Sequence, residues 1–507
     1  MKKIGLILML VTMVTGGVLA EMPAGFSLSG SIDAPYTFRS KELNTFLNGG
    51  LTTSDFLLAP LVTLDTKFQM KSKVMGAIQF QNRRLANTTL PAVSGTANPA
   101  QIGGAYNINP SVTQAYIKVS EFFSPKLAMG YGIQDLNLTL RKGEGAFFMH
   151  PAASLTPSGQ LPLDMNVVLR TNFVLNQGRV KGVSEFSGFV FDYGSIKDDN
   201  YAINLFWGKT MANNVIVGTK RNEDLLAGVN VSYKLSGDNN MLKVLLAQMN
   251  NPGANMAIMT LGVGVDYFGA MPNLEIYGEA YTQSGTLSNT GVDAAGKTVD
   301  VDQVSMAYRV GAKYDFANNP LKPWAGFSYW FLDGGDDSNT YEQGSVKYTE
   351  NNHFVSYEDA QSTLILEDQT WGLNLNSNYT AIKLEGGITT SLTMSGEKKD
   401  VDLKILVGMF TLNTVPWVRN AGADGLLYAG GDDVADKTDD ALGTEIDITA
   451  NLRYTENLSF TLGLGMLSGS DFFGGIDVDD RNNNTTRKDD ESFDSMTLVT
   501  LGANLKF

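Results

Sequence analysis

The sequence predicts an all-β protein, a transmembrane antiparallel up-and-down β-barrel of about 18 strands with long extracellular loops. Three observations predict it. Apolar and polar residues alternate in segment after segment, short and long connections succeed each other along the chain, and residues 499–507 are apolar at every second position up to the terminal Phe507. Because lipid cannot satisfy backbone hydrogen-bonding groups, a sheet placed in a membrane must close on itself.

Residues 1–20 have the composition of a cleaved signal peptide. Lys2 and Lys3 precede an apolar stretch at residues 4–18, and Ala20 is a small residue at the expected cleavage site, just before Glu21. The apolar stretch is too short for a membrane anchor. We therefore expect removal of residues 1–20 during export, and a barrel formed by residues 21–507 in the outer membrane of a Gram-negative-type cell.

Composition excludes several classes of protein. The chain has no cysteine, so neither disulfides nor thiolate metal sites stabilise it. Its formal net charge is −15, or −17 once Lys2 and Lys3 are removed. Such an acidic balance argues against nucleic acid as a partner.

The predicted strands have one apolar and one polar face, most clearly at residues 443–454. The same alternation recurs at residues 225–235, 261–267, 304–316, 401–411 and 458–466. A soluble β-sandwich also alternates. Many of these segments, however, exceed the five or six residues usual in soluble sheets and approach the length of a tilted membrane strand.

The lengths of the connections provide a strand count. Short turns are expected at residues 71–73, 123–125, 194–199, 236–239, 269–272, 317–320, 395–399 and 456–457. Long connections are expected at residues 40–55, 85–110, 285–302, 334–368, 413–442 and 468–494. Roughly 20 segments show the alternation of apolar and polar residues. If residues 163–175 and 371–379 are treated as loop, short and long connections alternate along the whole chain and about 18 strands remain. A range of about 16 to 20 stays open.

With apolar side chains facing lipid, the residues between them point inward. The candidate channel-lining residues chosen from this set are Lys67, Arg83, Lys118, Arg141, Arg309, Lys404, Glu445, Asp447 and Arg453. Basic residues outnumber acidic ones among them, and rings of Lys and Arg favour anions. The alternative, equally open, is a mixed lining whose charges pair across the pore and select little. Arg83 and Arg141 are placed near the outer ends of their strands.

The connection after Arg141 contains Gly143, Phe147, Phe148 and His150. A glycine-bearing, aromatic loop that follows an inward arginine could fold into the lumen and narrow it. An ordinary surface loop is the alternative.

The C-terminal third resembles a known family. Residues 442–448, Tyr454, residues 464–466 and residues 469–472 resemble the closing strands of the alginate export family, and residues 115–119 and 131–136 are similar to earlier family strands. Ile133 stands where the family usually has an arginine. The resemblance implies a monomeric outer-membrane barrel whose electropositive lumen passes an anionic polysaccharide.

The sequence offers little for an enzyme. His150 and His353 are the only histidines, and no nucleophile elbow, Walker, dinucleotide or zinc pattern surrounds them. We therefore expect neither catalysis nor a cofactor. Carboxylates at Asp477, Asp479 and Asp480 are weak candidates for Ca²⁺ ligands, because their spacing does not match an EF-hand; a solvated acidic loop is the simpler interpretation.

Two functions follow from this sequence. The first is an outer-membrane channel for passive diffusion of anionic or polar organic solutes, with oligo- or polysaccharide among them. The second is a closed barrel that conducts little and binds surface partners through its loops. Expected partners are outer-membrane lipid and lipopolysaccharide, the transported solute, and the barrel-assembly machinery, which would read the last strand ending at Phe507.

Overall fold

The structure of the chain is a computed structural model. It describes residues 25–43, 54–58, 61–70, 73–82, 110–134, 136, 138, 140, 186–210, 216–217, 220–221, 224–235, 239–251, 256–292, 298–334, 341–342, 345–346, 350–351, 354, 362–368, 372, 375, 378–413, 441–469 and 495–507.

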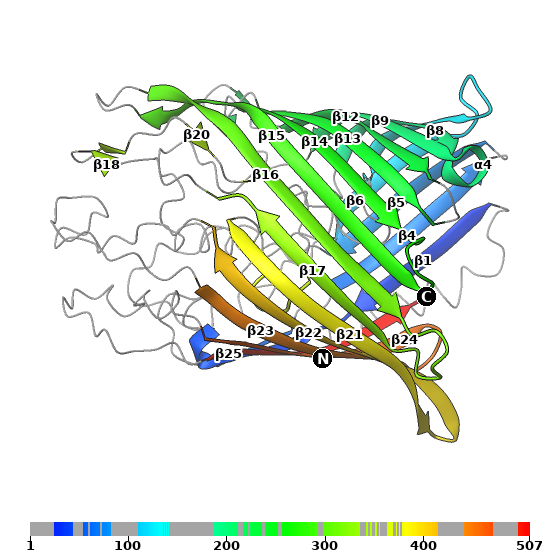
Figure 1. The fold of residues 1–507 in the computed structure, drawn as a ribbon. Coiled ribbons are helices and arrows are strands. Elements are labelled where there is room, and N and C mark those ends of the chain that lie inside the picture. Colours follow the sequence, from blue (N-terminus) through cyan, green and yellow to red (C-terminus); the bar gives the residue numbers. More distant parts are fainter. Residues whose placement is uncertain are drawn as a thin grey trace.

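Most of the described chain is β-strand (Figure 1). The strands of the main sheet are β1 (Phe26–Asp33), β2 (Tyr36–Arg39), β3 (Asp55–Leu58), β4 (Leu61–Met70), β5 (Val74–Asn82), β6 (Pro110–Val119), β7 (Leu127–Gln134), β8 (Phe186–Ser195), β9 (Tyr201–Thr210), β12 (Asp224–Lys234), β13 (Met241–Asn251), β14 (Met256–Tyr267), β15 (Leu274–Val292), β16 (Thr298–Asp315), β17 (Trp324–Leu332), β20 (Glu350–Asn351), β21 (Tyr379–Met394), β22 (Glu397–Leu412), β23 (Ala441–Arg453), β24 (Leu458–Ser468) and β25 (Ser495–Lys506).

Among the described residues, four short strands outside the main sheet and a helical turn lie in the connections. The pairs β10 (Ile216–Val217) with β11 (Lys220–Arg221) and β18 (Tyr341–Glu342) with β19 (Ser345–Val346) form separate two-stranded sheets. The single helical turn α4 (Ile196–Asp199) joins β8 to β9, and the Ser195 hydroxyl caps it by accepting a hydrogen bond from Lys197 N–H.

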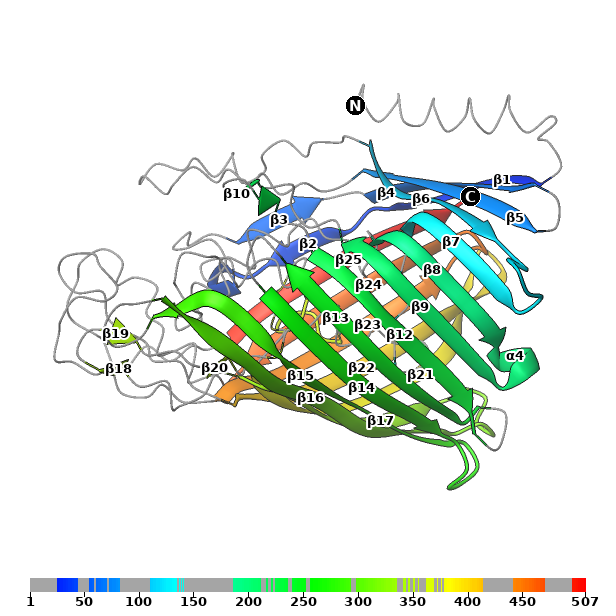
Figure 2. The ribbon, with the colours of Figure 1, turned by 90° about the horizontal axis from the view of Figure 1, so that it is seen from above.

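The main sheet closes into a barrel of 18 antiparallel strands. The first two barrel strands are each divided: β1 and β2 both pair with β25, while β4 and β3 pair with β1 and β2. Pro35, which has no N–H to donate, lies at the first division. Closure is visible in Figure 2, where the first strands (blue) lie beside β25 (red). The predicted fold class is therefore confirmed, including the strand number.

The two ends of the barrel differ, as the connection lengths predict. Eight short turns lie at one end, on the right in Figure 1, which we call the short-turn end. The structure corrects two details. The expected long connection at residues 285–302 is largely strand, since β15 extends to Val292 and β16 begins at Thr298. The β21–β22 turn contains only Ser395 and Gly396, whose φ values of 52° and 85° suit a two-residue hairpin turn.

The two segments that the sequence analysis assigned to loop can be followed in part. In residues 371–378 the described residues lie outside the strands, and Tyr379 opens β21. Residues 163–175 lie outside the described part of the chain, as do residues 1–24, which include the expected signal peptide.

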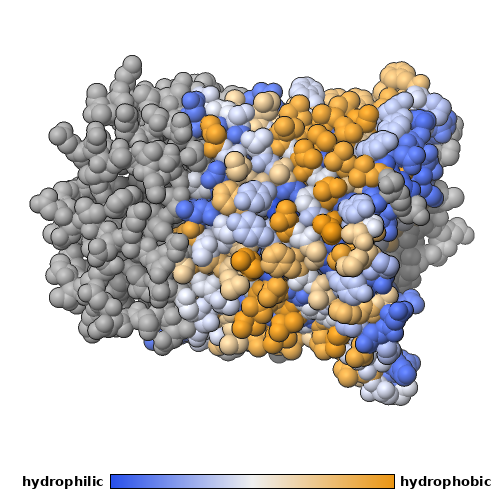
Figure 3. All heavy atoms as spheres, in the orientation of Figure 1, coloured by the Kyte–Doolittle hydropathy of each residue, from blue (hydrophilic) through white to orange (hydrophobic). Residues whose placement is uncertain are grey.

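An apolar band surrounds the barrel on the outside. On β14 the residues Leu261, Val263 and Val265 are 37–43% exposed, whereas the alternate residues Thr260 and Asp266 are buried. Figure 3 shows such apolar side chains gathered in the middle of the barrel wall, with hydrophilic residues toward the short-turn end. Strand alternation alone produces this arrangement, because successive side chains point to opposite faces. Among the described residues, no helix has the length and apolar composition needed to cross a membrane.

Candidate functional site

The inner face of the barrel is the candidate functional site, because the buried and half-buried charged side chains of several strands point into it. The exposed apolar residues of a strand show which of its side chains point inward. Ile446 and Ile448 are exposed on the outside of β23, so Glu445 and Asp447, which alternate with them, point inward. The same reasoning places Arg309 of β16 and Lys383 of β21 on the inner face.

Part of the connection between β17 and β21 lies inside the barrel. We call residues 362–368 the inner segment. Leu364 of this segment contacts the inner wall at β24, where Gly463 and Gly465 have no side chains: a Cβ on either would come within 3.0–3.2 Å of Leu364. Glycine at these two positions is therefore what allows the segment to approach the strand backbone so closely.

Two carboxylates on β23 hold the inner segment by its backbone. Ile365 N–H and Leu366 N–H donate to Oε1 and Oε2 of Glu445 at 2.5 and 2.9 Å. Leu364 N–H donates to Oδ2 of Asp447 at 3.0 Å. Glu445 is fully buried and Asp447 nearly so. Both carboxyl groups are buried and together accept from the N–H groups of three consecutive residues, so they attach the inner segment to β23 at three points.

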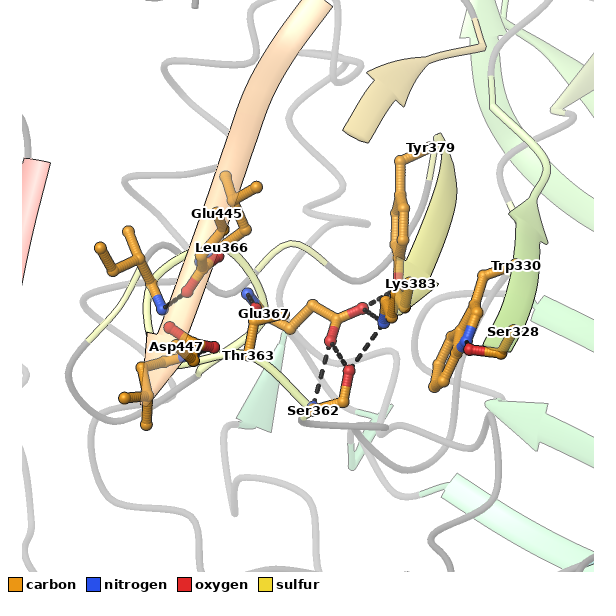
Figure 4. Close-up of polar contacts among 12 residues, drawn as sticks. Ser328, Trp330, Ser362, Thr363, Leu366, Glu367, Tyr379, Lys383, Glu445 and Asp447 are labelled. Carbon is orange, nitrogen blue, oxygen red and sulfur yellow. Dashed lines mark hydrogen bonds and ion pairs between the residues drawn. The ribbon is translucent and has the colours of Figure 1, made fainter. Parts of the chain in front are cut away.

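The other side of the inner segment is attached to β21 through Glu367 (Figure 4). Its carboxylate forms an ion pair with Lys383 and accepts hydrogen bonds from Tyr379 Oη at 2.7 Å and from the Ser362 hydroxyl at 2.7 Å. Lys383 and Glu445 are each register partners of Gly408 on β22. The inner segment therefore spans the wall from β21 to β23.

A second buried ion pair lies beside this attachment. Arg309 of β16 pairs with Glu279 of β15, and both side chains are almost fully buried. The Trp330 ring contacts both cations, with Lys383 Nζ 3.5 Å and the Arg309 guanidinium carbon 5.0 Å from its centroid. Burying charge is tolerated only where partners replace water, and here carboxylates and an aromatic ring do so.

A second segment also enters the lumen. After β7 ends at Gln134, the described residues Leu136, Leu138 and Leu140 are buried. A Cβ on Gly264 of β14 would lie 2.6 Å from the Leu140 Cβ, so the segment reaches a strand well separated from β7 in the barrel.

The wall beneath these leucines is apolar. Its inward residues, which belong to the same buried cluster as the leucines, are Phe186, Val190, Phe206, Leu226, Leu245, Ala247, Met249 and Ile258. The rings of Phe186 and Phe206 lie over glycines of the next strands. A Cβ added to Gly208 would be 2.7 Å from the Phe186 ring, and one added to Gly228 would be 2.6 Å from the Phe206 ring. One side of the lumen is thus packed like a protein core.

Elsewhere the inner face is polar, and three of its cations form ion pairs with carboxylates. Lys118 pairs with Asp192 at 2.6 Å. On the opposite wall, Lys404 pairs with Glu385 at 2.7 Å, and Arg453 with Asp402 at 2.6 Å. The side chains of these pairs are 22–60% exposed, so they face open space rather than a packed interior.

The residues singled out from the sequence therefore lie in different settings. Lys67, Lys118, Lys404 and Arg453 are on the polar parts of the inner face. Arg309, Glu445 and Asp447 also point inward but are buried by contacts to Glu279 and to the inner segment.

Several predictions concern residues outside the described chain: Arg83, Arg141, His150, His353, Asp477, Asp479 and Asp480. Within the described ranges, no group of three or more His, Cys, Asp or Glu residues could hold a metal ion.

Sequence reasoning missed Lys383, Glu367 and Trp330. Lys383 could have been found, because Ile382 and Leu384 fix its inward phase in the same way as at the residues that were chosen. Trp330 is the inward residue of a strand whose aromatic composition hides the alternation. Glu367 carries no local pattern, since its position depends on a connection folding back into the barrel.

Comparison with known proteins gives likeness of fold only. No protein family matches the sequence, and no curated protein does. Similar solved structures include OmpT, an outer membrane protein of Vibrio cholerae (9% identity, covering 96% of this chain and 99% of that one, TM-score 0.37). An anion-selective porin from Comamonas acidovorans (9%, 95% and 99%, 0.40) and a mutant of the Rh. blastica porin (12%, 95% and 100%, 0.35) are also similar. The resemblance to the alginate export family is not confirmed.

Proposed function

We propose that this protein is an outer-membrane channel that lets small polar organic solutes diffuse passively through a partly obstructed barrel. The observation that carries the proposal is the combination of an apolar outer band with inward ion pairs that stay exposed, such as Lys404 with Glu385. A barrel of about eighteen strands is wide enough for an aqueous path, and exposed charges are stable only where water reaches them.

The lining supports weak charge selectivity. In the polar regions Lys118, Lys404 and Arg453 each form an ion pair with a carboxylate, so positive potential is largely compensated there. Selective passage of anions would need a net positive constriction. An oligosaccharide or other neutral polar solute fits the paired lining better than a strongly charged one.

A closed barrel that binds surface partners through its long connections is the second candidate. It is favoured by the inner segment and by the buried leucines after β7, which together occupy part of the lumen. In that case the outer-membrane lipid and lipopolysaccharide would remain neighbours of the barrel, but solute flow would be minor.

Single-channel recording of the purified chain in planar bilayers separates the two candidates. Stepwise conductance at defined voltage supports the channel, whereas current at the background level refutes it. Reversal potential in a salt gradient then reports selectivity. We expect a value near zero for the paired lining, and a strong preference for anions or cations would contradict that expectation.

A further inference from the structure

Trp324 lies inside the barrel at the short-turn end, away from the inner segment. It is the first residue of β17 and shares the inner face with the buried Ser328 and Trp330, whereas Phe327 is exposed on the outside. Trp324 itself is only partly buried. A tryptophan that is not needed to fill a core, and that faces the lumen, is available to contact a solute.

The wall around Trp324 is arranged so that its indole lies against the backbone. In the strand register Trp324 is opposite Gly387 of β21, and Gly387 is opposite Lys404 of β22. A Cβ on Gly387 would be 2.6 Å from the indole Nε1. Since glycine leaves this place free, the ring extends along the wall toward Lys404 instead of projecting across the lumen.

Charged groups of both signs surround the ring. Lys313 Nζ and Lys404 Nζ lie 5.0 and 5.9 Å from its centroid. Lys313 is 3.3 Å from Asp315, and Lys404 is 2.7 Å from Glu385. All four side chains remain 22–57% exposed, so their donors and acceptors can still take additional partners.

We propose that Trp324, Lys313, Lys404, Asp315 and Glu385 form a binding subsite for a neutral sugar ring at the short-turn mouth of the channel. The apolar face of a pyranose stacks on the indole, and its hydroxyls, which both donate and accept, bind the ammonium and carboxylate groups beside it. A carboxylate solute would meet Glu385 and Asp315, and a cation would meet the two lysines. A neutral polyhydroxyl ring matches both sets. This inference rests on the proposed channel function and names its substrate class.

The test uses the full chain in planar bilayers with maltotriose as the probe. We expect maltotriose to interrupt the ion current in a concentration-dependent manner. Trp324→Ala should weaken this block about tenfold, equivalent to about 1.4 kcal/mol, and Trp324→Phe should weaken it less. Lys404→Gln, which keeps the aromatic ring, should also weaken it. Trp207→Ala is the matched control, because Trp207 is 64% exposed on the outside of β9 and should leave the block unchanged.

Each outcome has a distinct meaning. If the parent conducts but maltotriose does not block it, or blocks Trp324→Ala equally well, the subsite is refuted while the channel stands. Stronger block by glucuronic acid than by glucose would contradict a neutral ligand. If the parent does not conduct, the channel function fails, and calorimetric titration of maltotriose into the detergent-solubilised parent and Trp324→Ala proteins decides the subsite. Equal heats for the two proteins would refute it.

Discussion

The attachment of the inner segment to Glu445 can be tested by the isosteric change Glu445→Gln. Both carboxylate oxygens of Glu445 accept backbone N–H groups, from Ile365 and Leu366. A glutamine can accept only one of these, and its NH₂ group would face the other N–H, donor against donor. The substitution therefore leaves a buried N–H of the inner segment without an acceptor.

The magnitude follows from the hydrogen bond that is lost. That bond contributes about 1 kcal/mol, and the buried N–H left without an acceptor costs about 1–3 kcal/mol more, so the total loss is about 3 kcal/mol. At 1.4 kcal/mol per tenfold change, the fraction of molecules with the inner segment released should rise roughly a hundredfold.

A thiol reporter measures this release directly, because the chain contains no cysteine of its own. Leu366→Cys places a single thiol at a position that is 1% exposed. When reclosing is fast, the rate of modification by a water-soluble thiol reagent is proportional to the open population. We expect Glu445→Gln to accelerate modification roughly a hundredfold, and single-channel traces of the same variant without the reporter to show more frequent changes of conductance.

The matched control is Glu385→Gln. Glu385 is also an inward carboxylate, but it pairs with Lys404 and not with the inner segment. Modification of the reporter should therefore stay near the parent rate in this variant. An unchanged rate in Glu445→Gln, or equal acceleration in the two variants, would show that the segment is not held by Glu445.

Three further predictions concern stability and orientation. Lys383→Ala leaves the buried Glu367 without its cation and should cost about 3–5 kcal/mol, seen as a lower thermal unfolding temperature in detergent; an unchanged temperature would mean that Tyr379 and Ser362 alone satisfy Glu367. Phe186→Ala removes the ring that lies against Gly208 inside the barrel and should cost about 3–5 kcal/mol by the same measurement. Val263→Arg, on the outer apolar band of β14, should cost about 2–4 kcal/mol when folding into vesicles is measured, whereas Ser29→Arg, on the exposed inner face of β1, should fold normally. Equal penalties for these two would contradict the assignment of faces.

The sequence was sufficient to predict most of the strands, their faces and a barrel of about 18 strands. These features depend on a period of two residues and on connection length, both of which are local. Glu445 and Asp447 were placed on the inner face because Ile446 and Ile448 alternate with them. Where apolar and polar residues alternate strictly, the tertiary structure agrees with the predicted faces, because only one orientation of the strand turns its apolar side chains outward.

The tertiary structure decided what the inner residues contact. Glu445 binds Ile365 and Leu366, which lie about eighty residues earlier in the chain; Arg309 is buried against Glu279 of the neighbouring strand. No local pattern encodes such contacts, because they exist only after the ring of strands has closed and a connection has folded back into it. The same phase therefore places Lys404 at an exposed inner surface and Lys383 in a buried ion pair. The sequence pattern determines that a side chain points into the barrel. Whether that side chain is buried depends on which distant segment also lies inside the barrel.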